Sequence, residues 1–196
     1  MHNAVKQEAT MSHNKRAELI QNALPLFYRN GFHATGMDLV AKETGVSKTS
    51  IYKHFRTKED LIRAVLQLRD ENFRTWLFGR MEALSDTPKG QLLAMFDALE
   101  EWFLEDKFQG CMFIKASAEF QSKEDAINLQ SFDHKRLLED HFHNLAAEAG
   151  YAQATQLSRE LLLLKEGAIV LAAMSHSHAP AMQAKRMAEV LLSETN

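Results

Sequence analysis

Apolar residues recur along most of the chain at spacings of three and four, the repeat of an amphipathic helix, and no segment alternates as a strand does. The pattern predicts an all-α protein of about nine helices. The first four are expected at residues 12–30, 36–44, 48–54 and 58–84. Pro25 lies inside the first of them. Because an interior proline removes a backbone donor, we expect a kink there or a helix boundary near Ala23.

Short polar residues stand where these helices are expected to begin, and such residues cap helix N-termini. Thr35 is expected to cap the second helix and Ser47 the third. Thr57, with Asp60 three residues later, forms the capping pattern of the long fourth helix. Gly45 allows a tight turn between the second and third helices. Two short helices around a glycine turn predict a helix-turn-helix.

The second half of the chain also has a helical pattern. After a loop at residues 85–90, helices are expected as far as about residue 106, at 111–121, 124–149 and 155–175, and from Ala179-Pro180 to Leu192. Charged residues interrupt the most apolar stretch, 161–174, which is therefore too short and too polar to span a bilayer and is predicted to be a buried helix. The expected domains are residues 8–61 and 62–196, with the boundary near the start of the fourth helix.

The composition is that of a globular protein. Its 196 residues are 45% hydrophobic, enough for a substantial core. Cys111 is the single cysteine, so no intramolecular disulfide can form, and the N-terminus has no apolar signal-peptide core. We therefore expect a cytoplasmic protein. No motif indicates a cofactor.

Positive charge is concentrated near the N-terminus. The net charge is −3, yet residues 1–60 hold nine Lys and Arg against six Asp and Glu. Between Gly45 and Lys58 the charged residues are Lys48, Lys53, Arg56 and Lys58, with no acid among them. Such a basic patch suits contact with phosphates, and its alternative is an ordinary solvated helix face.

Four segments carry a family resemblance: Gly31-Phe32-His33-Ala34-Thr35, Leu39-Val40-Ala41, Gly45-Val46-Ser47-Lys48, and Ile51-Tyr52-Lys53-His54-Phe55-Arg56-Thr57-Lys58-Glu59-Asp60-Leu61. In order and spacing they resemble the DNA-binding signature of the TetR family of bacterial transcriptional regulators, over about residues 15–61. The resemblance implies an N-terminal three-helix DNA-binding domain and a helical domain for effector binding and dimerisation. One departure is Gly36, where the family commonly has a serine whose hydroxyl can touch phosphate.

The third helix is the expected recognition helix. Lys48, Thr49 and Ser50 lie at its N-terminal end, where short polar groups can read base edges in the major groove. The resemblance implies that Tyr52 and His54 face phosphates; the alternatives are a packed aromatic ring and a helix cap. The predicted DNA-binding residues are Thr35, Ser47, Lys48, Thr49, Ser50, Tyr52, Lys53, His54 and Lys58.

The rest of the chain carries a weaker resemblance. Gly110-Cys111-Met112-Phe113-Ile114 is similar to a segment in a subset of TetR-type regulators, whose middle helices enclose an effector and whose last two helices form the dimer interface. Here that interface would use the side of residues 155–175 that carries Leu161, Leu164, Ala168, Leu171 and Ala172. The candidate pocket residues, for which core packing is the alternative role, are Phe96, Leu99, Trp102, Phe103, Cys111, Met112, Phe113, Phe120, Phe132 and Leu138.

The single cysteine and the histidines suggest two other kinds of chemistry. Cys111 is either a redox or electrophile sensor, which needs a nearby cation or a helix N-terminus such as the one expected near Gly110, or an inert buried thiol. His134, His141 and His143 share one expected helix, and His176 and His178 lie near a turn; their spacing does not match the usual pairs of metal ligands, so no metal site is expected.

The sequence therefore predicts a repressor that binds a pseudo-palindromic DNA operator as a homodimer and is released by a small-molecule effector of unknown identity. One alternative is a ligand-independent regulator or an activator of the same fold. A more distant alternative is a small helical enzyme that uses Glu119 with His134 or His141. No catalytic motif supports the enzyme alternative. The protein is not expected to bind a membrane.

Overall fold

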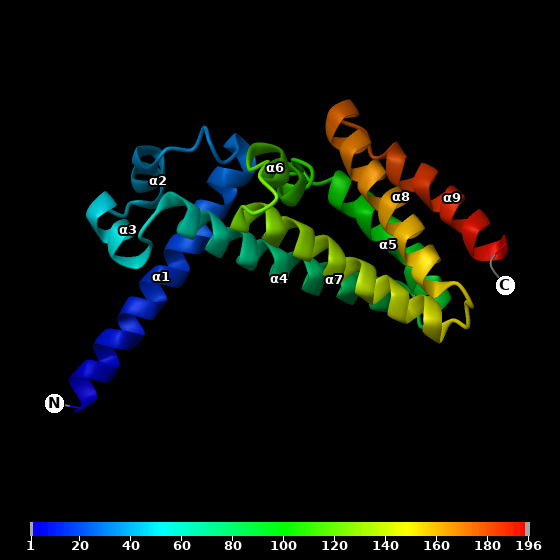
Figure 1. Ribbon diagram of the computed structural model, residues 1–196, viewed down its shortest axis with the longest axis horizontal. Coiled ribbons are helices and arrows are strands. Elements are labelled where there is room, and N and C mark those ends of the chain that lie inside the picture. Colours follow the sequence, from blue (N-terminus) through cyan, green and yellow to red (C-terminus); the bar gives the residue numbers. More distant parts are fainter. Residues whose placement is uncertain (1, 195–196) are drawn as a thin grey trace. The chain divides into compact units, whose positions relative to one another are not determined.

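A computed structural model describes residues 2–194, with side chains described for 14–193. This part of the chain contains nine α-helices and no strand, which confirms the all-α prediction (Figure 1). The helices are α1 (His2–Asn30), α2 (Met37–Thr44), α3 (Lys48–His54), α4 (Lys58–Leu84), α5 (Pro88–Phe103), α6 (Met112–Glu119), α7 (Ala126–Glu148), α8 (Ala154–Ser175) and α9 (Ala179–Glu194).

The chain divides into two compact units. The first is made of the stretch that ends at Glu71 together with residues 112–131, so it contains α6 as well as the helix-turn-helix. The second is made of residues 72–111 and of the chain from Phe132 onward. This division does not test the functional domains expected at residues 8–61 and 62–196, which stay a prediction.

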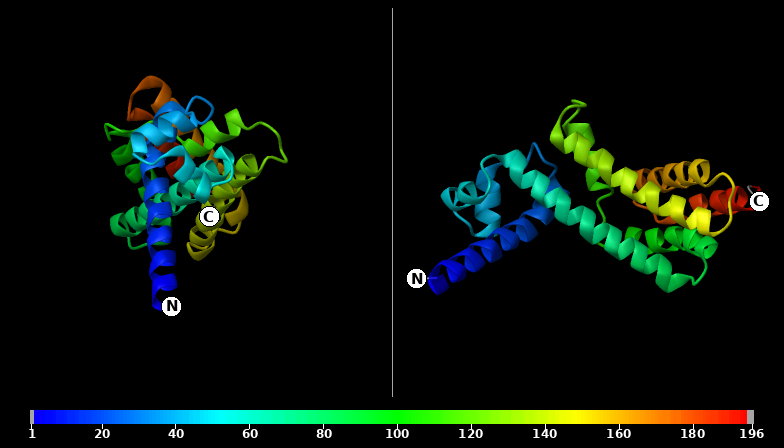
Figure 2. Two further views of the ribbon diagram at one scale, coloured as in Figure 1. Left: turned by 90° about the vertical axis from the view of Figure 1, so that its left-hand side faces the viewer. Right: turned by 60° about the horizontal axis from the view of Figure 1, so that its bottom comes forward.

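The core of the first unit forms around α1. Phe27 is fully buried and its ring stacks on that of Phe32, with 5.7 Å between centroids. Ile51 of α3 and Leu61 of α4 are also fully buried in this unit. Figure 2 shows α2 and α3 beside the C-terminal half of α1. Burial of these apolar side chains is what holds the short helices α2 and α3, which are too short to be stable alone.

α1 is longer than expected and unbroken. It begins at His2, and the helix continues through Pro25, so the boundary expected near Ala23 is wrong. Pro25 and Gln21 are both exposed. The Gln21 carbonyl, which loses its partner because proline has no N–H, can therefore bond to water instead, and this lowers the cost of the interruption.

Two of the three predicted caps are confirmed. The Ser47 hydroxyl accepts from the Ser50 N–H at 3.2 Å. Thr57 and Asp60 bond reciprocally, backbone N–H to carboxylate at 3.2 Å and backbone N–H to hydroxyl at 3.1 Å. The expected Thr35 cap is wrong: Gly36 is the N-cap of α2 and makes no side-chain cap bond. Thr35 is instead buried, and its hydroxyl donates to the Gly31 carbonyl at 2.6 Å.

In the second unit, α5, α8 and α9 pack against one another (Figure 2). Leu92 and Phe96 of α5, Leu161 of α8 and Ala181 of α9 are fully buried there. The loop expected at residues 85–90 is shorter, because Thr87 caps α5 and Pro88 begins it, a position where proline costs no hydrogen bond. Pro180 likewise lies in the first turn of α9, which begins at Ala179 as expected.

α8 is only partly buried, contrary to the prediction. Leu161, Ala168 and Ala172 face the interior of the unit, whereas Leu163 is 73% exposed and Met174 75% exposed. Within the described residues, no helix combines the length and the hydrophobicity that a bilayer crossing requires.

Candidate functional site

α3 has a buried side and a side exposed to solvent. Ile51 and Phe55 are buried in the core of the first unit. Lys48, Thr49 and Lys53 are exposed, and the Tyr52 ring is 47% exposed, a large fraction for a tyrosine. The predicted DNA-binding residues Ser47, Ser50 and His54 accompany them, the first exposed and the other two half-buried. One polar face of α3 is therefore open to a ligand.

Two of the lysines at this face have partners that the sequence did not reveal. Lys48 forms an ion pair with Asp38 of α2, with 2.5 Å between the charged atoms. Both side chains are exposed, so solvent screens the pair and a phosphate can replace Asp38 at little cost. Lys58 donates to the His33 carbonyl at 3.3 Å. Lys53 has no ion pair within the part of the chain that the structure describes, which leaves its ammonium available.

Thr35 is not a candidate DNA-binding residue in this structure. Its side chain is fully buried and its hydroxyl is engaged with the Gly31 carbonyl, so it cannot reach a phosphate. The prediction placed Thr35 at the start of α2, where an N-cap side chain would be exposed. Because the helix begins one residue later, Thr35 turns inward.

Glu119, at the end of α6, holds the turn that follows α1. Its carboxylate accepts from the Phe32 N–H at 2.9 and 3.1 Å, from the His33 N–H at 2.5 Å, and bonds to the His33 ring at 2.8 Å. Burial alone would raise the pKa of Glu119, but the hydrogen bonds from His33 and Phe32 together lower it. Glu119, the carboxylate that the enzyme alternative would use, thus bonds mainly to backbone N–H groups.

A second contact attaches α6 to α1. Lys115 donates to the Tyr28 carbonyl at 3.1 Å, and its ammonium lies 5.3 Å from the centroid of the Tyr28 ring. The Phe120 ring, expected in the effector pocket, lies 4.8 Å from the His33 ring and packs on Phe32. α6 and the residue after it are therefore part of the first unit, which also contains α3.

Replacing Glu119 by alanine is expected to lower the free energy of unfolding by about 1–3 kcal/mol, because the Phe32 and His33 N–H groups lose their acceptor. Urea unfolding of both proteins at one protein concentration measures the difference. Glu124→Ala is the control, since among the described residues that exposed carboxylate bonds to Ser122 and its own backbone alone. Equal stability of the Glu119 variant and the wild type would show that the turn does not need this contact.

The ten candidate pocket residues are divided between the two units. Met112, Phe113 and Phe120 belong to the first unit, and the others to the second. Phe96, Leu99, Trp102, Phe103, Cys111 and Leu138 are buried. Phe132 is 66% exposed and therefore does not line an enclosed pocket of its unit, which corrects that prediction. The pocket itself stays a prediction.

A buried charged cluster lies in the second unit and was not predicted. Lys165 of α8 is 1% exposed and bonds to the Glu166 carboxylate at 2.7 Å. Lys135 of α7 bonds to the other oxygen of Glu166 at 2.7 Å and donates to the Cys111 sulfur at 3.2 Å. The only sign in the sequence was the pair of charges inside an apolar run.

The cluster changes the acidity of its members. Burial alone would raise the pKa of Glu166, but the ammonium groups of Lys165 and Lys135 lower it to about 2. Burial lowers the pKa of Lys165. Lys135 supplies the nearby cation that the Cys111 sensor hypothesis requires; that hypothesis stays a prediction.

The histidines have separate surroundings. The His141 ring stacks on Phe78 with 3.7 Å between centroids, and burial lowers its pKa. His143 lies 3.3 Å from the Thr155 hydroxyl, and His178 lies 3.0 Å from the Glu100 carboxylate. Among the described residues, no three His, Cys, Asp or Glu side chains come together as metal ligands.

An exposed apolar face lies on the last two helices. It consists of Leu163, Val170, Leu171 and Met174 of α8 and Met187 and Val190 of α9, which we call the α8–α9 face. Of the predicted interface residues, Leu161, Ala168 and Ala172 are instead buried within the chain, which corrects that part of the prediction. Leu171 is exposed and Leu164 half-buried.

Comparison with known proteins agrees with the geometry. Residues 19–65 match the bacterial regulatory proteins of the tetR family. The chain is 34% identical over 94 residues to the HTH-type transcriptional repressor KstR2 of Mycolicibacterium smegmatis, covering 44% of each. It is 34% identical over 100 residues to the transcriptional activator FasR of the same species, covering 51% of this chain and 45% of FasR. The chain thus spans less than half the length of these two relatives.

The fold is shared over a longer stretch. SCO4454, a TetR-family transcriptional regulator from Streptomyces coelicolor, superposes with a TM-score of 0.85 at 26% identity, covering 92% of this chain and 95% of that one. All three relatives are named as transcriptional regulators, as the regulator prediction expects. The chain therefore has an N-terminal segment of the tetR family of bacterial regulatory proteins and shares the fold of a TetR-family regulator.

Proposed function

We propose that the chain is a repressor that binds a pseudo-palindromic operator in double-stranded DNA as a homodimer and is released by a small-molecule effector. The observation that carries this proposal is the polarity of α3. Its apolar residues Ile51 and Phe55 are buried, while Thr49, Tyr52 and Lys53 stand in solvent. A recognition helix needs this division, because one side must pack on the domain and the other must enter the major groove.

The exposed residues of α3 have distinct roles in this proposal. Lys48, Thr49 and Ser50 lie at the N-terminal end of the helix and select sequence through hydrogen bonds to base edges. Tyr52, Lys53 and His54, with Lys58 at the start of α4, bond to phosphates and set the position of the helix on the duplex. Ser47 caps α3 and keeps its first turn rigid.

Lys53→Ala is expected to weaken binding to every duplex and to reduce the slope of log affinity against log salt by about 1 for each phosphate that the lysine neutralises. The assay is fluorescence anisotropy at several salt concentrations, with duplexes that the wild-type protein selects from a random pool. Lys107→Ala, which removes an equal charge from an exposed site in the second unit, is the control. An unchanged slope for Lys53→Ala would refute the phosphate role.

Thr49→Ala is the companion variant in the same assay. It is expected to change which sequences are selected while leaving the salt slope as in the wild type, because Thr49 is uncharged. The two variants therefore separate positioning from sequence selection.

The α8–α9 face supports the dimer. Single exposed apolar residues are common on protein surfaces, but six of them on two helices that pack against each other suit a protein–protein interface. Self-association through one face gives a two-fold dimer, which presents two copies of α3 to two half-sites.

The second unit is the proposed effector domain. Its aromatic side chains Phe73, Trp76, Trp102 and Phe108 lie close together; the ring centroids of Trp102 and Phe108, for example, are 4.8 Å apart. Lys165 lies 5.3 Å from the Phe73 ring. Apolar and aromatic surroundings with a few polar groups are typical of small-molecule sites. An effector that binds one state of the dimer more tightly would shift the population away from the DNA-binding state.

A further inference from the structure

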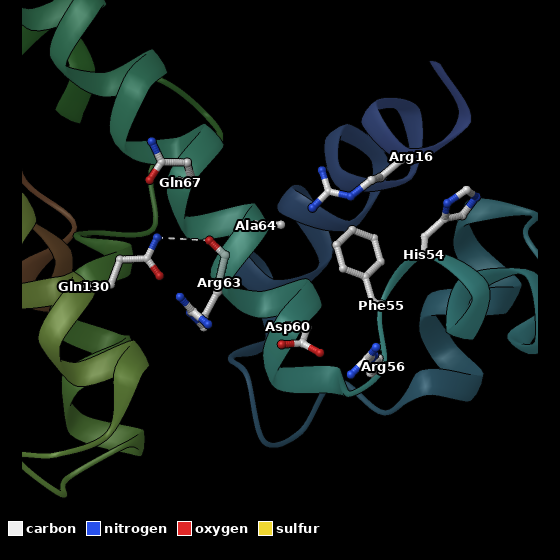
Figure 3. A pocket seen from close by; sticks show the side chains of 9 residues that line it. All are labelled: Arg16, His54, Phe55, Arg56, Asp60, Arg63, Ala64, Gln67 and Gln130. Carbon is white, nitrogen blue, oxygen red and sulfur yellow. Dashed lines mark hydrogen bonds between the residues drawn. The ribbon is translucent and has the colours of Figure 1, made fainter. Parts of the chain in front are cut away.

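A hollow of about 510 Å³ lies in the first unit, beside the end of α3. Figure 3 shows that its walls come from α1, from the turn between α3 and α4, from α4 and from the start of α7. We call it the arginine hollow, because Arg16, Arg56 and Arg63 all line it. Its volume falls in the range of small-molecule sites, about 300–1,000 Å³, and exceeds what a simple ion needs.

Positive charge dominates the arginine hollow. None of its three arginines forms an ion pair within the described part of the chain. Asp60 is the single carboxylate in the lining, and one of its oxygens already accepts from the Thr57 N–H. All three arginines are exposed, so solvent screens their charges, and an anion that enters the hollow supplies the counter-charge that they lack.

Two side chains of the hollow are already held in position. The Arg16 guanidinium lies 4.7 Å from the centroid of the Phe55 ring, a cation–π contact that orders the side chain and leaves its N–H groups free. Gln130 donates to the Arg63 carbonyl at 3.0 Å (Figure 3). The Oε1 atom of Gln130 is buried and has no donor among the described residues. This buried Oε1 atom favours a ligand that donates a hydrogen bond to it or that moves Arg63 toward it.

A second hollow, of about 240 Å³, adjoins the first along α1 and α4. The two share Arg16, Ala64 and Gln67 in their linings, so they are neighbouring parts of one groove. Ile20 and Leu68 line the second hollow, together with Gln21 and the carboxylate of Glu71. The groove therefore offers a cationic end and an adjoining end of mixed polarity.

We propose that the arginine hollow binds a free phosphorylated small molecule of nucleotide size, with its phosphate on Arg56 and Arg63 and its less polar body along α1. Phosphate fits better than carboxylate, because three guanidinium groups supply more N–H donors than two oxygens can accept. Guanidinium groups also pair with phosphate oxygens in bidentate fashion. This ligand is separate from the effector proposed for the second unit.

The position of the hollow couples it to DNA binding. His54, a predicted phosphate contact of α3, also lines the hollow. The Phe55–Thr57 turn, which sets where α4 and Lys58 begin, forms another part of its wall. A ligand bound here competes with DNA for His54 and changes the local charge, so it lowers DNA affinity.

The test is isothermal titration calorimetry of the full chain without DNA, at fixed ionic strength, with inorganic pyrophosphate, ADP and adenosine as probes. Both phosphorylated probes are expected to bind, and adenosine at least tenfold more weakly than ADP. The double variant Arg56→Gln with Arg63→Gln is expected to weaken ADP binding at least tenfold. Arg136→Gln, which removes an exposed arginine from α7, is the control and is expected to stay within twofold of wild type.

Three results would overturn the proposal. No binding of either phosphorylated probe would show that the hollow takes no free phosphate compound. Binding that the double variant retains would place the probe elsewhere. If the wild-type chain binds neither probe and the double variant loses affinity for DNA, the hollow binds the DNA backbone instead. Equal melting temperatures of variants and wild type verify that each protein is folded.

Discussion

Replacing Glu166 by glutamine is expected to lower the free energy of unfolding at pH 7 by about 3–5 kcal/mol, the usual cost of removing one partner from a buried ion pair. The wild-type carboxylate bonds to Lys165 and Lys135 at 2.7 Å each. Glutamine has a similar shape but no charge, so two ammonium groups are left without a counter-charge in a buried place. Denaturant unfolding at one fixed protein concentration measures the loss, since stability in a dimer depends on concentration.

Glu101→Gln is the matched control. Glu101 also receives two bonds from a cation, at 2.9 and 2.6 Å from Arg80, but this pair lies at the surface. Solvent screens it, and a small effect is expected. Equal losses for the two variants would show that the burial of Glu166 has no energetic consequence.

The buried Glu166 carboxylate also predicts how the stabilities of wild type and Glu166→Gln differ at acidic pH. The pKa of Glu166 is lowered to about 2 in the folded chain. A lowered carboxyl pKa stabilises the fold above the unfolded-state pKa, about 4.3 for Glu, and this stabilisation is lost as the pH falls toward 2. Wild type is therefore expected to lose its advantage over Glu166→Gln between about pH 4.3 and pH 2. A constant difference across that range would contradict the assignment.

The second large effect concerns the α8–α9 face. Leu171→Glu combined with Met187→Glu is expected to give monomers, because each substitution puts a charge into the proposed apolar contact. Leu171 is 55% exposed and Met187 60% exposed in the single chain, so neither change disturbs the fold of one subunit. Operator affinity is expected to fall at least a hundredfold, about 2.7 kcal/mol or more, since a monomer contacts a single half-site.

Sedimentation velocity measures the oligomeric state, and anisotropy with the selected duplex measures affinity. The control replaces two exposed leucines outside the face, Leu104→Glu and Leu129→Glu, at 63% and 50% exposure. Monomers in both double variants would mean that added charge alone separates the subunits. Dimers in the Leu171 and Met187 variant would exclude the α8–α9 face as the interface.

The helix-turn-helix could be predicted almost residue by residue because its signals are local. The cap at Ser47, the turn at Gly45 with its φ of +70°, and the capping pair Thr57 and Asp60 each act over three residues or fewer. The bounds of α3 and α4 were therefore expected correctly. The error at Thr35 was a shift of one residue, enough to exchange an exposed position for a buried one.

Contacts between distant residues could not be predicted. Glu119 meets His33 across 86 positions, and nothing in either segment specifies the other. α8 shows a different difficulty, since it is apolar on both sides. Periodicity identifies the two sides but does not say that Leu161 and Ala168 pack within the chain while Leu163 and Met174 face outward. The charges at Lys165 and Glu166 likewise could not be paired without Lys135, a residue of another helix.

The Glu119 contact has a consequence for how the protein is made. The unit that carries α3 is discontinuous, because residues 112–131 complete it. During synthesis the ribosome must therefore translate all of α4 and α5 before α6 can supply the acceptor for Phe32 and His33. At about 5–20 residues per second this delay lasts seconds, during which the nascent helix-turn-helix lacks the carboxylate that its turn after α1 requires.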